Sequence, residues 1–279
     1  MHGTAANSAR MGARLQAWAI CLLLAGVASA SASNWETSVT AGPPGPFPPP
    51  RSVVATYHFG WAGITAATAE IHFASTPPDR FQLDGTGRTT GFVRALWKMD
   101  VTHHAIADSE ELRPIEMEQT ESVRSKKMVT KLAFNSAGVT ATRIETKHGV
   151  TKPGTKQFKL PSLFDLHSAL LYMRSQSLRQ GTVQRIVVFP ASSAYLATIT
   201  VVGREKVSVP AGTFNAIKLD LQLSKIGKKG DLEPHRKFRR GTIWISDDPD
   251  RMLLRIYAQI FVGTVFAELQ SVQFETEKK

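Results

Sequence analysis

Apolar and polar positions alternate with a period of two along most of the chain after residue 52. At the odd positions of 53–59 stand valine, alanine, tyrosine and phenylalanine, and threonine and histidine occupy two of the even ones. Because neighbouring side chains of a strand point to opposite faces, this alternation predicts β-strands. The segments that share the pattern are 53–59, 67–73, 81–86, 99–107, 115–119, 128–134, 139–146, 184–189, 195–202, 206–209, 214–223, 241–245, 253–260 and 264–274.

One segment has helical spacing instead. The run from Ser162 to Arg174 is predicted to form a helix, which Ser162 can cap and whose first turn suits Asp165. The apolar face of this helix would consist of Leu163, Leu166, Leu170 and Met173. A weaker helical pattern covers residues 91–98.

The number of predicted strands constrains the architecture. Roughly twelve strands exceed what an open twisted sheet holds without curling. We therefore predict a mainly β fold: a large curved antiparallel sheet or barrel-like half-barrel with one main helix. Two arrangements of residues 53–274 stay open, namely one sheet with the helix on its concave side, or two β-rich lobes that meet near residues 150–180.

The first 52 residues carry the pattern of export. Arg10 and Arg14 precede the apolar run 15–27, and small residues follow at 28–30, which predicts a signal peptide over residues 1–30. We expect cleavage near Ala30 or Ala32, and the alternative is an uncleaved anchor. Residues 31–52 are rich in proline and predict an extended linker that spaces the folded part from the processing site.

The single cysteine, Cys21, lies inside the apolar run of the signal peptide. Lipid attachment needs a small residue before the cysteine, and Ile20 stands there, so we expect a protein that is not lipidated. A mature chain without cysteine has no disulfide, thiolate zinc site or cysteine nucleophile. We therefore expect an exported protein, periplasmic or secreted, that its apolar core alone holds together.

The chain is basic, with a formal net charge of +11. Such a charge favours anionic surfaces, and for an exported protein we expect envelope lipid or another anionic surface as partner rather than nucleic acid. The excess is concentrated between residues 225 and 240, in a predicted hairpin loop. The candidate contacts for an anionic surface are Lys225, Lys228, Lys229, Arg236, Lys237, Arg239 and Arg240. The alternative is that this loop is only solvated.

Other polar motifs favour structural roles. Residues 247–250 contain three aspartates, but the spacing and glycine of a calcium loop are absent. We predict a turn whose Asp side chains bond their own backbone, with Arg251 paired to one of them. His103 and His104 would point to opposite faces of a strand, whereas His58 and His72 would share one, which is a weak metal signal. We expect no cofactor and no metal.

Four stretches together carry a family resemblance. They are Gly60–Ile64, Asp165–Arg174, Val207–Lys218 and Ile243–Arg251, of which the Pro-Ala-Gly-Thr-Phe turn at 210–214 is the most specific. In order and spacing they resemble an exported bacterial family known as the domain of unknown function numbered three-one-zero-eight, over about residues 53–274. The resemblance implies export and a β-rich fold. It supplies no catalytic residues.

Three functional hypotheses follow. The first is a non-enzymatic envelope protein whose curved sheet holds an apolar or lipid-like ligand beneath its helix. The second is a structural or protein-interaction module of the envelope. The third is an unrecognised hydrolase, although the common nucleophile motifs are missing from the sequence.

Overall fold

The structure is a computed structural model that describes residues 35–40, 42–261 and 263–275. These residues lie in one compact unit, Trp35–Lys279. The predicted signal peptide over 1–30, its cleavage near Ala30 or Ala32 and the expected absence of lipid on Cys21 all concern residues outside this description. Within the described part, no helix is both long and apolar enough to cross a membrane.

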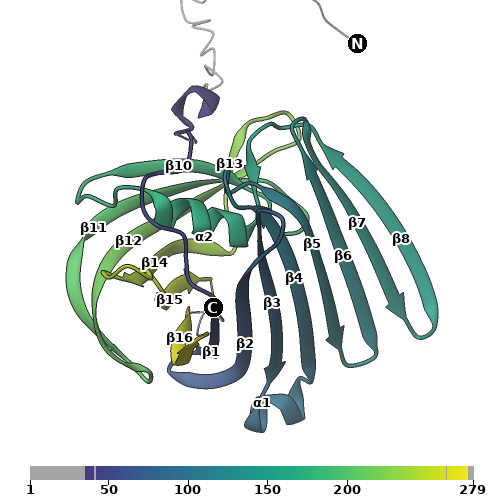
Figure 1. The fold of residues 1–279 in the computed structure, drawn as a ribbon. Coiled ribbons are helices and arrows are strands. Elements are labelled where there is room, and N and C mark those ends of the chain that lie inside the picture. The colour runs from purple at the N-terminus through teal and green to yellow at the C-terminus, as the bar shows by residue number, and fades with distance from the viewer. Residues whose placement is uncertain (1–34, 41, 262, 276–279) are drawn as a thin grey trace, which may run out of the picture. The chain divides into compact units, whose positions relative to one another are not determined.

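Most of the described chain forms a single large sheet (Figure 1). Its strands are β1 Val53–Trp61, β2 Ile64–Thr76, β3 Arg80–Thr89, β4 Met99–Asp108, β5 Pro114–Val123, β6 Lys126–Asn135, β7 Gly138–Lys147, β8 Val150–Phe158, β9 Leu163–Phe164, β10 Val183–Val188, β11 Tyr195–Val209, β12 Gly212–Ile226, β13 Leu232–Pro234, β14 Phe238–Ser246, β15 Leu253–Ile260 and β16 Gly263–Phe274. The helices described are the short η1 Trp35–Ser38, α1 Gly91–Leu96 and the main helix α2 Leu166–Ser175. This confirms the predicted mainly β fold with one main helix.

The two halves of the chain meet in the middle of the sheet. Across it the strands follow the order β8-β7-β6-β5-β4-β3-β2-β1-β16-β15-β14-β12-β11-β10-β9, with β13 beside β12. The first and last strands, β1 and β16, are antiparallel neighbours. The described pairs are antiparallel except for β9 with β10. Residues on both sides of 150–180 therefore belong to one continuous sheet, whose outermost strands are β8 and β9.

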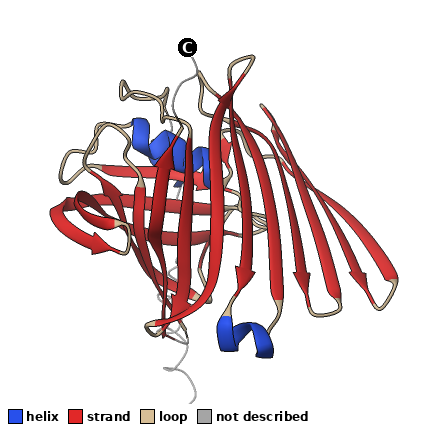
Figure 2. Ribbon diagram, turned by 60° about the horizontal axis from the view of Figure 1, so that its bottom comes forward, coloured by secondary structure: helices blue, strands red, loops and turns tan. Residues whose placement is uncertain are grey.

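The sheet curves around α2 (Figures 1 and 2). Ala105, Met117 and Leu132 stand next to each other on β4, β5 and β6 and are buried. They share an apolar cluster with Val187 and Phe189 from the region of β10, near the far end of the strand order. Apolar burial on one face thus draws distant strands together, which is the physical reason for the predicted curvature.

Helix α2 begins later than predicted and buries only part of the predicted face, including Met173. Asp165 is its N-cap, and the side chains of Asp165 and Ser168 bond each other's backbone N–H groups in a capping box. Leu163 belongs to strand β9, and Leu166 is exposed instead of buried. The face that packs in the core includes Tyr172 and Met173. The apolar spacing was misleading because the cap sets where the helical turns begin.

Two departures from the predicted strands have clear reasons. Strand β8 carries no alternation, since it is an outer strand and eight of its nine residues are exposed. Its Pro153 and its lysines suit an unpaired edge, where they discourage pairing with another chain. The predicted segments 195–202 and 206–209 form one strand, β11, with an irregularity in its pairing between Val201 and Gly203. The weaker helical pattern at 91–98 corresponds to α1, which ends at Leu96.

The described part of the proline-rich segment packs on the sheet unit, which differs from the expected spacer. Trp35 is buried, and its Nε1 donates to the carbonyl of Gly230 at 2.7 Å. Farther along, the N–H of Gly42 donates to the hydroxyl of Tyr172 at 3.0 Å, and that of Gly45 to Ser175 Oγ at 3.0 Å. Proline-rich chain leaves such backbone donors free, and α2 satisfies them.

Candidate functional site

A cavity of about 200 Å³ lies where α2, the connection from β4 to β5 and the proline-rich segment meet. Most of its lining is apolar, with prolines 48–50 and Phe47 on one side and Leu112 and Leu171 on the other. Two charged residues also line it, Arg174 from the last turn of α2 and Glu110 from the connection between β4 and β5. We call this space the Arg174 cavity.

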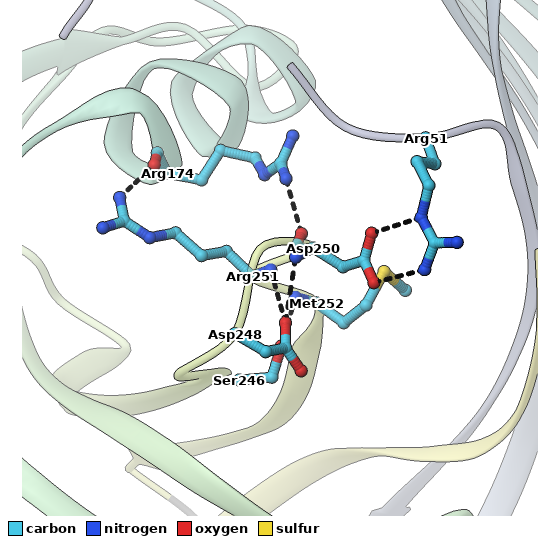
Figure 3. Close-up of polar contacts among 7 residues, drawn as sticks. All are labelled: Arg51, Arg174, Ser246, Asp248, Asp250, Arg251 and Met252. Carbon is cyan, nitrogen blue, oxygen red and sulfur yellow. Dashed lines mark hydrogen bonds and ion pairs between the residues drawn. The ribbon is translucent and has the colours of Figure 1, made fainter. Parts of the chain in front are cut away.

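Arg174 is buried with one part of its guanidinium unused. It is 5% exposed, and its Nη2 donates to the carbonyl oxygen of Asp250 at 2.5 Å (Figure 3). Its Nη1 is buried and has no hydrogen-bond partner among the described residues. Burial, and next the charge of Arg251, lower the pKa of Arg174 to about 10, so the group is still protonated at neutral pH. A buried cation with free N–H groups is well placed to bind an anion.

The turn between β14 and β15 positions the end of this side chain. Asp248 Oδ1 accepts hydrogen bonds from Ser246 Oγ at 2.8 Å and from the N–H groups of Asp250 and Arg251 at 2.9 and 3.1 Å. The Asp250 carboxylate accepts hydrogen bonds from Nε and Nη2 of Arg51, at 2.8 and 2.6 Å (Figure 3). The predicted turn with aspartate bonding its own backbone is therefore present.

The side chain of Arg251 was predicted to pair with an aspartate, but among the described residues it bonds backbone carbonyls instead. Its Nη1 donates to the carbonyl oxygens of Arg174 and Gln176, the latter at 2.6 Å. Both carbonyls lie at the C-terminus of α2, where a cation is favoured. Its guanidinium also lies over the ring of Phe47, 3.3 Å from the centroid. Arg251 thus joins the helix end to the proline-rich segment.

The arrangement can bind a molecule with a small anionic group and an apolar part. Arg174 supplies unused donors, and the proline, phenylalanine and leucine side chains supply apolar contacts. Sequence reasoning missed Arg174, because a basic residue in the last turn of a helix is ordinary and nothing local indicates burial. The proline run at 43–50 and the Asp-rich turn at 247–250 are far apart in the sequence, and only the fold brings both of them to α2.

The seven basic residues predicted as an anionic contact are spread over β12, β14 and the two connections that join these strands through β13. Lys225 lies in β12 and pairs with Glu233 at 3.3 Å, and Arg240 lies in β14 and pairs with the buried Asp220. Within the described chain, no ion pair involves Lys228, Lys229, Arg236, Lys237 or Arg239. The structure therefore leaves five of the seven available for a contact, which stays a prediction.

The histidines lie as the strand geometry requires. His104 faces Asp84 across β3 and β4, with Nδ1 and Oδ1 2.6 Å apart, and it lines a cavity of about 300 Å³ together with other polar and charged residues. Burial opposes ionisation of Asp84, but hydrogen bonds from His104 and Gln82 outweigh it and lower the pKa of that carboxyl. Among the described residues, no group of three or more histidines and carboxylates is arranged to hold a metal.

A buried polar cluster at the start of α2 was not predicted. Ser168 Oγ donates to Asp165 Oδ1 at 2.6 Å, while Asp165 Oδ2 and His167 Nε2 are buried without partners among the described residues. Burial raises the pKa of Asp165, and burial with the nearby His103 lowers that of His167 to about 3. Ser168 bonds a carboxylate and not an imidazole, so these three groups do not have the geometry of a catalytic triad.

Comparison with known families shows to which family the chain is similar. The model of a family described as protein of unknown function (DUF3108) matches residues 56–270. No curated protein matches the chain.

Solved structures add a likeness of fold. A β-barrel-like protein of the domain of unknown function DUF1849 from Brucella abortus is 10% identical, with a TM-score of 0.53, over 81% of this chain and 98% of that one. A candidate exported protein with a YmcC-like fold from Bacteroides fragilis has 10% identity and a TM-score of 0.35, over 82% of this chain and 99% of that one. The first similarity supports a shared barrel-like architecture, and the second is too low for any argument.

Proposed function

Since this chain belongs to the DUF3108 family, whose function is unknown, its activity must be inferred from its own residues, and we propose that it is a non-enzymatic cell-envelope protein that binds a lipid-like anion in the Arg174 cavity. The ligand class is an amphiphile with a small anionic group, such as a carboxylate or a phosphate monoester. The observation that carries the proposal is that the buried Arg174, whose Nη1 has no hydrogen-bond partner among the described residues, lines a cavity of mainly apolar residues.

Energetics support an anionic ligand over an empty cavity. Leaving a buried donor unsatisfied costs about 1–3 kcal/mol, and more when the group is charged. Arg174 keeps its charge near neutral pH, and its other arm bonds only a neutral carbonyl. The carboxylate of Asp250, whose carbonyl Arg174 bonds, is already held by Arg51. An incoming anion would therefore supply a partner that the protein itself lacks.

The size of the cavity limits the ligand. At about 200 Å³ it is smaller than the roughly 300–1,000 Å³ of sites for drug-sized ligands. It would hold the anionic group and the first few carbons of a chain, and the rest would lie along the exposed prolines. The expected export of the protein would bring it to a compartment rich in such molecules.

The test is binding of decanoate and decyl phosphate, with decanol as the uncharged probe, to the purified protein by native mass spectrometry and calorimetry. We expect both anions to bind and decanol to bind at least about tenfold more weakly, because only the anions use Arg174. The Arg174→Met variant should lose the preference for anions. Arg236→Met, which removes one positive charge from a residue outside the cavity lining, is the matched control.

A second variant separates ligand binding from a structural role of Arg174. Ser109→Trp places a large side chain in the cavity lining and leaves Arg174 in place. It should abolish binding, whereas Ser109→Ala should not. If Ser109→Trp binds decanoate as wild type does, or if decanol binds as tightly as decanoate, the cavity is not the site and the proposal is wrong. Co-purification of a protein partner without lipid would favour the interaction-module hypothesis.

A further inference from the structure

The strand order places several chain connections at one end of the sheet, and the residues that lead into β14 lie there too, because the N–H of Phe261 donates to the carbonyl of Lys237 at 3.0 Å. In an antiparallel meander, successive connections alternate between two ends. The connections β1–β2, β3–α1–β4, β5–β6, β7–β8 and β15–β16 therefore lie at the end opposite the Arg174 cavity and the β14–β15 turn. Figure 1 shows α1 at the lower edge of the sheet, with the β5–β6 and β7–β8 turns beside it.

Several of these connections carry large apolar side chains in solvent. Phe92 is 77% exposed and Ile64 is 63% exposed, and helix α1 buries none of its residues. The exposed apolar side chains of this end are Trp61, Ile64, Phe92, Leu96, Trp97, Val150 and Phe261. In a protein that buries its apolar face around α2, such a group of exposed side chains indicates an interaction surface.

Hydrogen bonds fix the connections side by side. The N–H of Thr90, before α1, donates to the carbonyl of Ala66 in β2 at 2.9 Å. That of Ala62, between β1 and β2, donates to Thr264 in β16 at 3.0 Å. Arg124, between β5 and β6, donates from Nη2 to the carbonyl of Leu96 at 2.8 Å. The exposed apolar side chains thus stand on neighbouring turns of a rigid sheet.

Basic side chains lie at the same end of the sheet, in the part of the chain from α1 to β8. The exposed cations are Lys98, Arg124, Lys127, Lys147 and Lys152. Two carboxylates of the same end are already paired, Asp100 with Arg94 at 2.8 Å and Glu145 with Lys126 at 3.0 Å. The surface therefore combines apolar tips with an unbalanced positive charge. We call these seven apolar and five basic residues the hairpin end.

We propose that the hairpin end docks the protein on an anionic membrane surface. Aromatic and aliphatic side chains enter the boundary between headgroups and acyl chains, while lysine and arginine bind lipid phosphates. The charge selects an anionic bilayer over a neutral one. This proposal is independent of the Arg174 cavity. A protein docked by its hairpin end would have that cavity at the end of the sheet away from the membrane.

The test is cosedimentation with vesicles of two parts phosphatidylcholine to one part phosphatidylglycerol, compared with pure phosphatidylcholine. We expect binding to the anionic vesicles that falls as salt rises. The double variant Phe92→Ser with Leu96→Ser should weaken it about tenfold or more, since both side chains are solvent-exposed and their loss leaves the core intact. Val202→Ser, at an exposed valine of β11, is the matched control.

Charge reversal gives the second comparison. Lys127→Glu with Lys147→Glu should reduce binding to the anionic vesicles by about tenfold or more, and Arg179→Glu with Lys206→Glu, at exposed cations outside the hairpin end, should leave it unchanged. Equal loss in both pairs would show an effect of net charge alone and would overturn the assignment to the hairpin end. So would full binding by the Phe92 and Leu96 variant, or an effect of that variant on self-association only. Decanoate binding should stay unchanged in every one of these variants, so the two proposals fail separately.

Discussion

His167 should make the folded state sensitive to acid. Burial, with the nearby charge of His103, lowers its pKa to about 3, against 6.5 in the unfolded chain. A histidine whose pKa is lowered by folding binds its proton more readily when unfolded. Its contribution to stability is therefore intact above pH 6.5 and is lost progressively as the pH falls towards 3.

The magnitude follows from the two pKa values. Between pH 7 and pH 4 the imidazole of the unfolded state takes up a proton while that of the folded state stays largely unprotonated, which removes about 3 kcal/mol of the free energy of unfolding. Asp165 acts in the opposite direction, because burial raises its pKa and the folded state then holds its proton more tightly. Wild type alone thus gives a mixed result, and a variant is needed to isolate the histidine.

The assay is urea unfolding of wild type and His167→Leu at pH 7 and pH 4. The leucine leaves no polar group in place of Nε2, which has no hydrogen-bond partner within the described chain. Wild type should lose about 3 kcal/mol more than the variant over this range. Equal losses in the two proteins would refute the reasoning, since they would show that His167 is not held neutral by burial.

Two further predictions concern the elements around the cavity. Asp248→Ala removes the acceptor for Ser246 Oγ and two backbone N–H groups, and should lower the free energy of unfolding by about 2 kcal/mol, whereas Asp248→Asn keeps an oxygen acceptor and should cost less than half of that. Chemical denaturation compares them, and equal costs would mean that charge and not the acceptor matters. Trp35→Ala removes a buried ring and its bond to Gly230, so residues 39–50 should become cleavable by protease while the sheet stays resistant. Protection equal to wild type would show that Trp35 does not anchor this segment.

Local pattern was sufficient for much of the secondary structure. Period-two alternation marks strands whose one face is buried, such as β4 with Ala105 and Ala107, because burial on one face and solvent on the other impose that pattern. It fails for β8, where both faces are solvated and no alternation exists. Helical apolar spacing likewise does not fix the start of α2, because the capping box of Asp165 and Ser168 decides the first residue of this helix.

The candidate sites could not be read from the sequence because they join residues far apart in the chain. Arg174 becomes a buried cation only when the fold closes residues 42–50 over α2 and brings the turn at Asp250 beneath it. The hairpin end likewise combines turns that are separated by up to about two hundred residues and that only the strand order places together.

The sequence by itself determined the mainly β fold, the curvature and the family, since these follow from short-range patterns and a strand number that an open sheet cannot hold. Tertiary structure alone decided that β1 and β16 pair at the centre of the sheet and that the described part of the proline-rich segment packs on α2. The reason is physical. Alternation specifies which face of a strand is buried, whereas the choice of neighbour depends on the burial and hydrogen bonding of the complete chain.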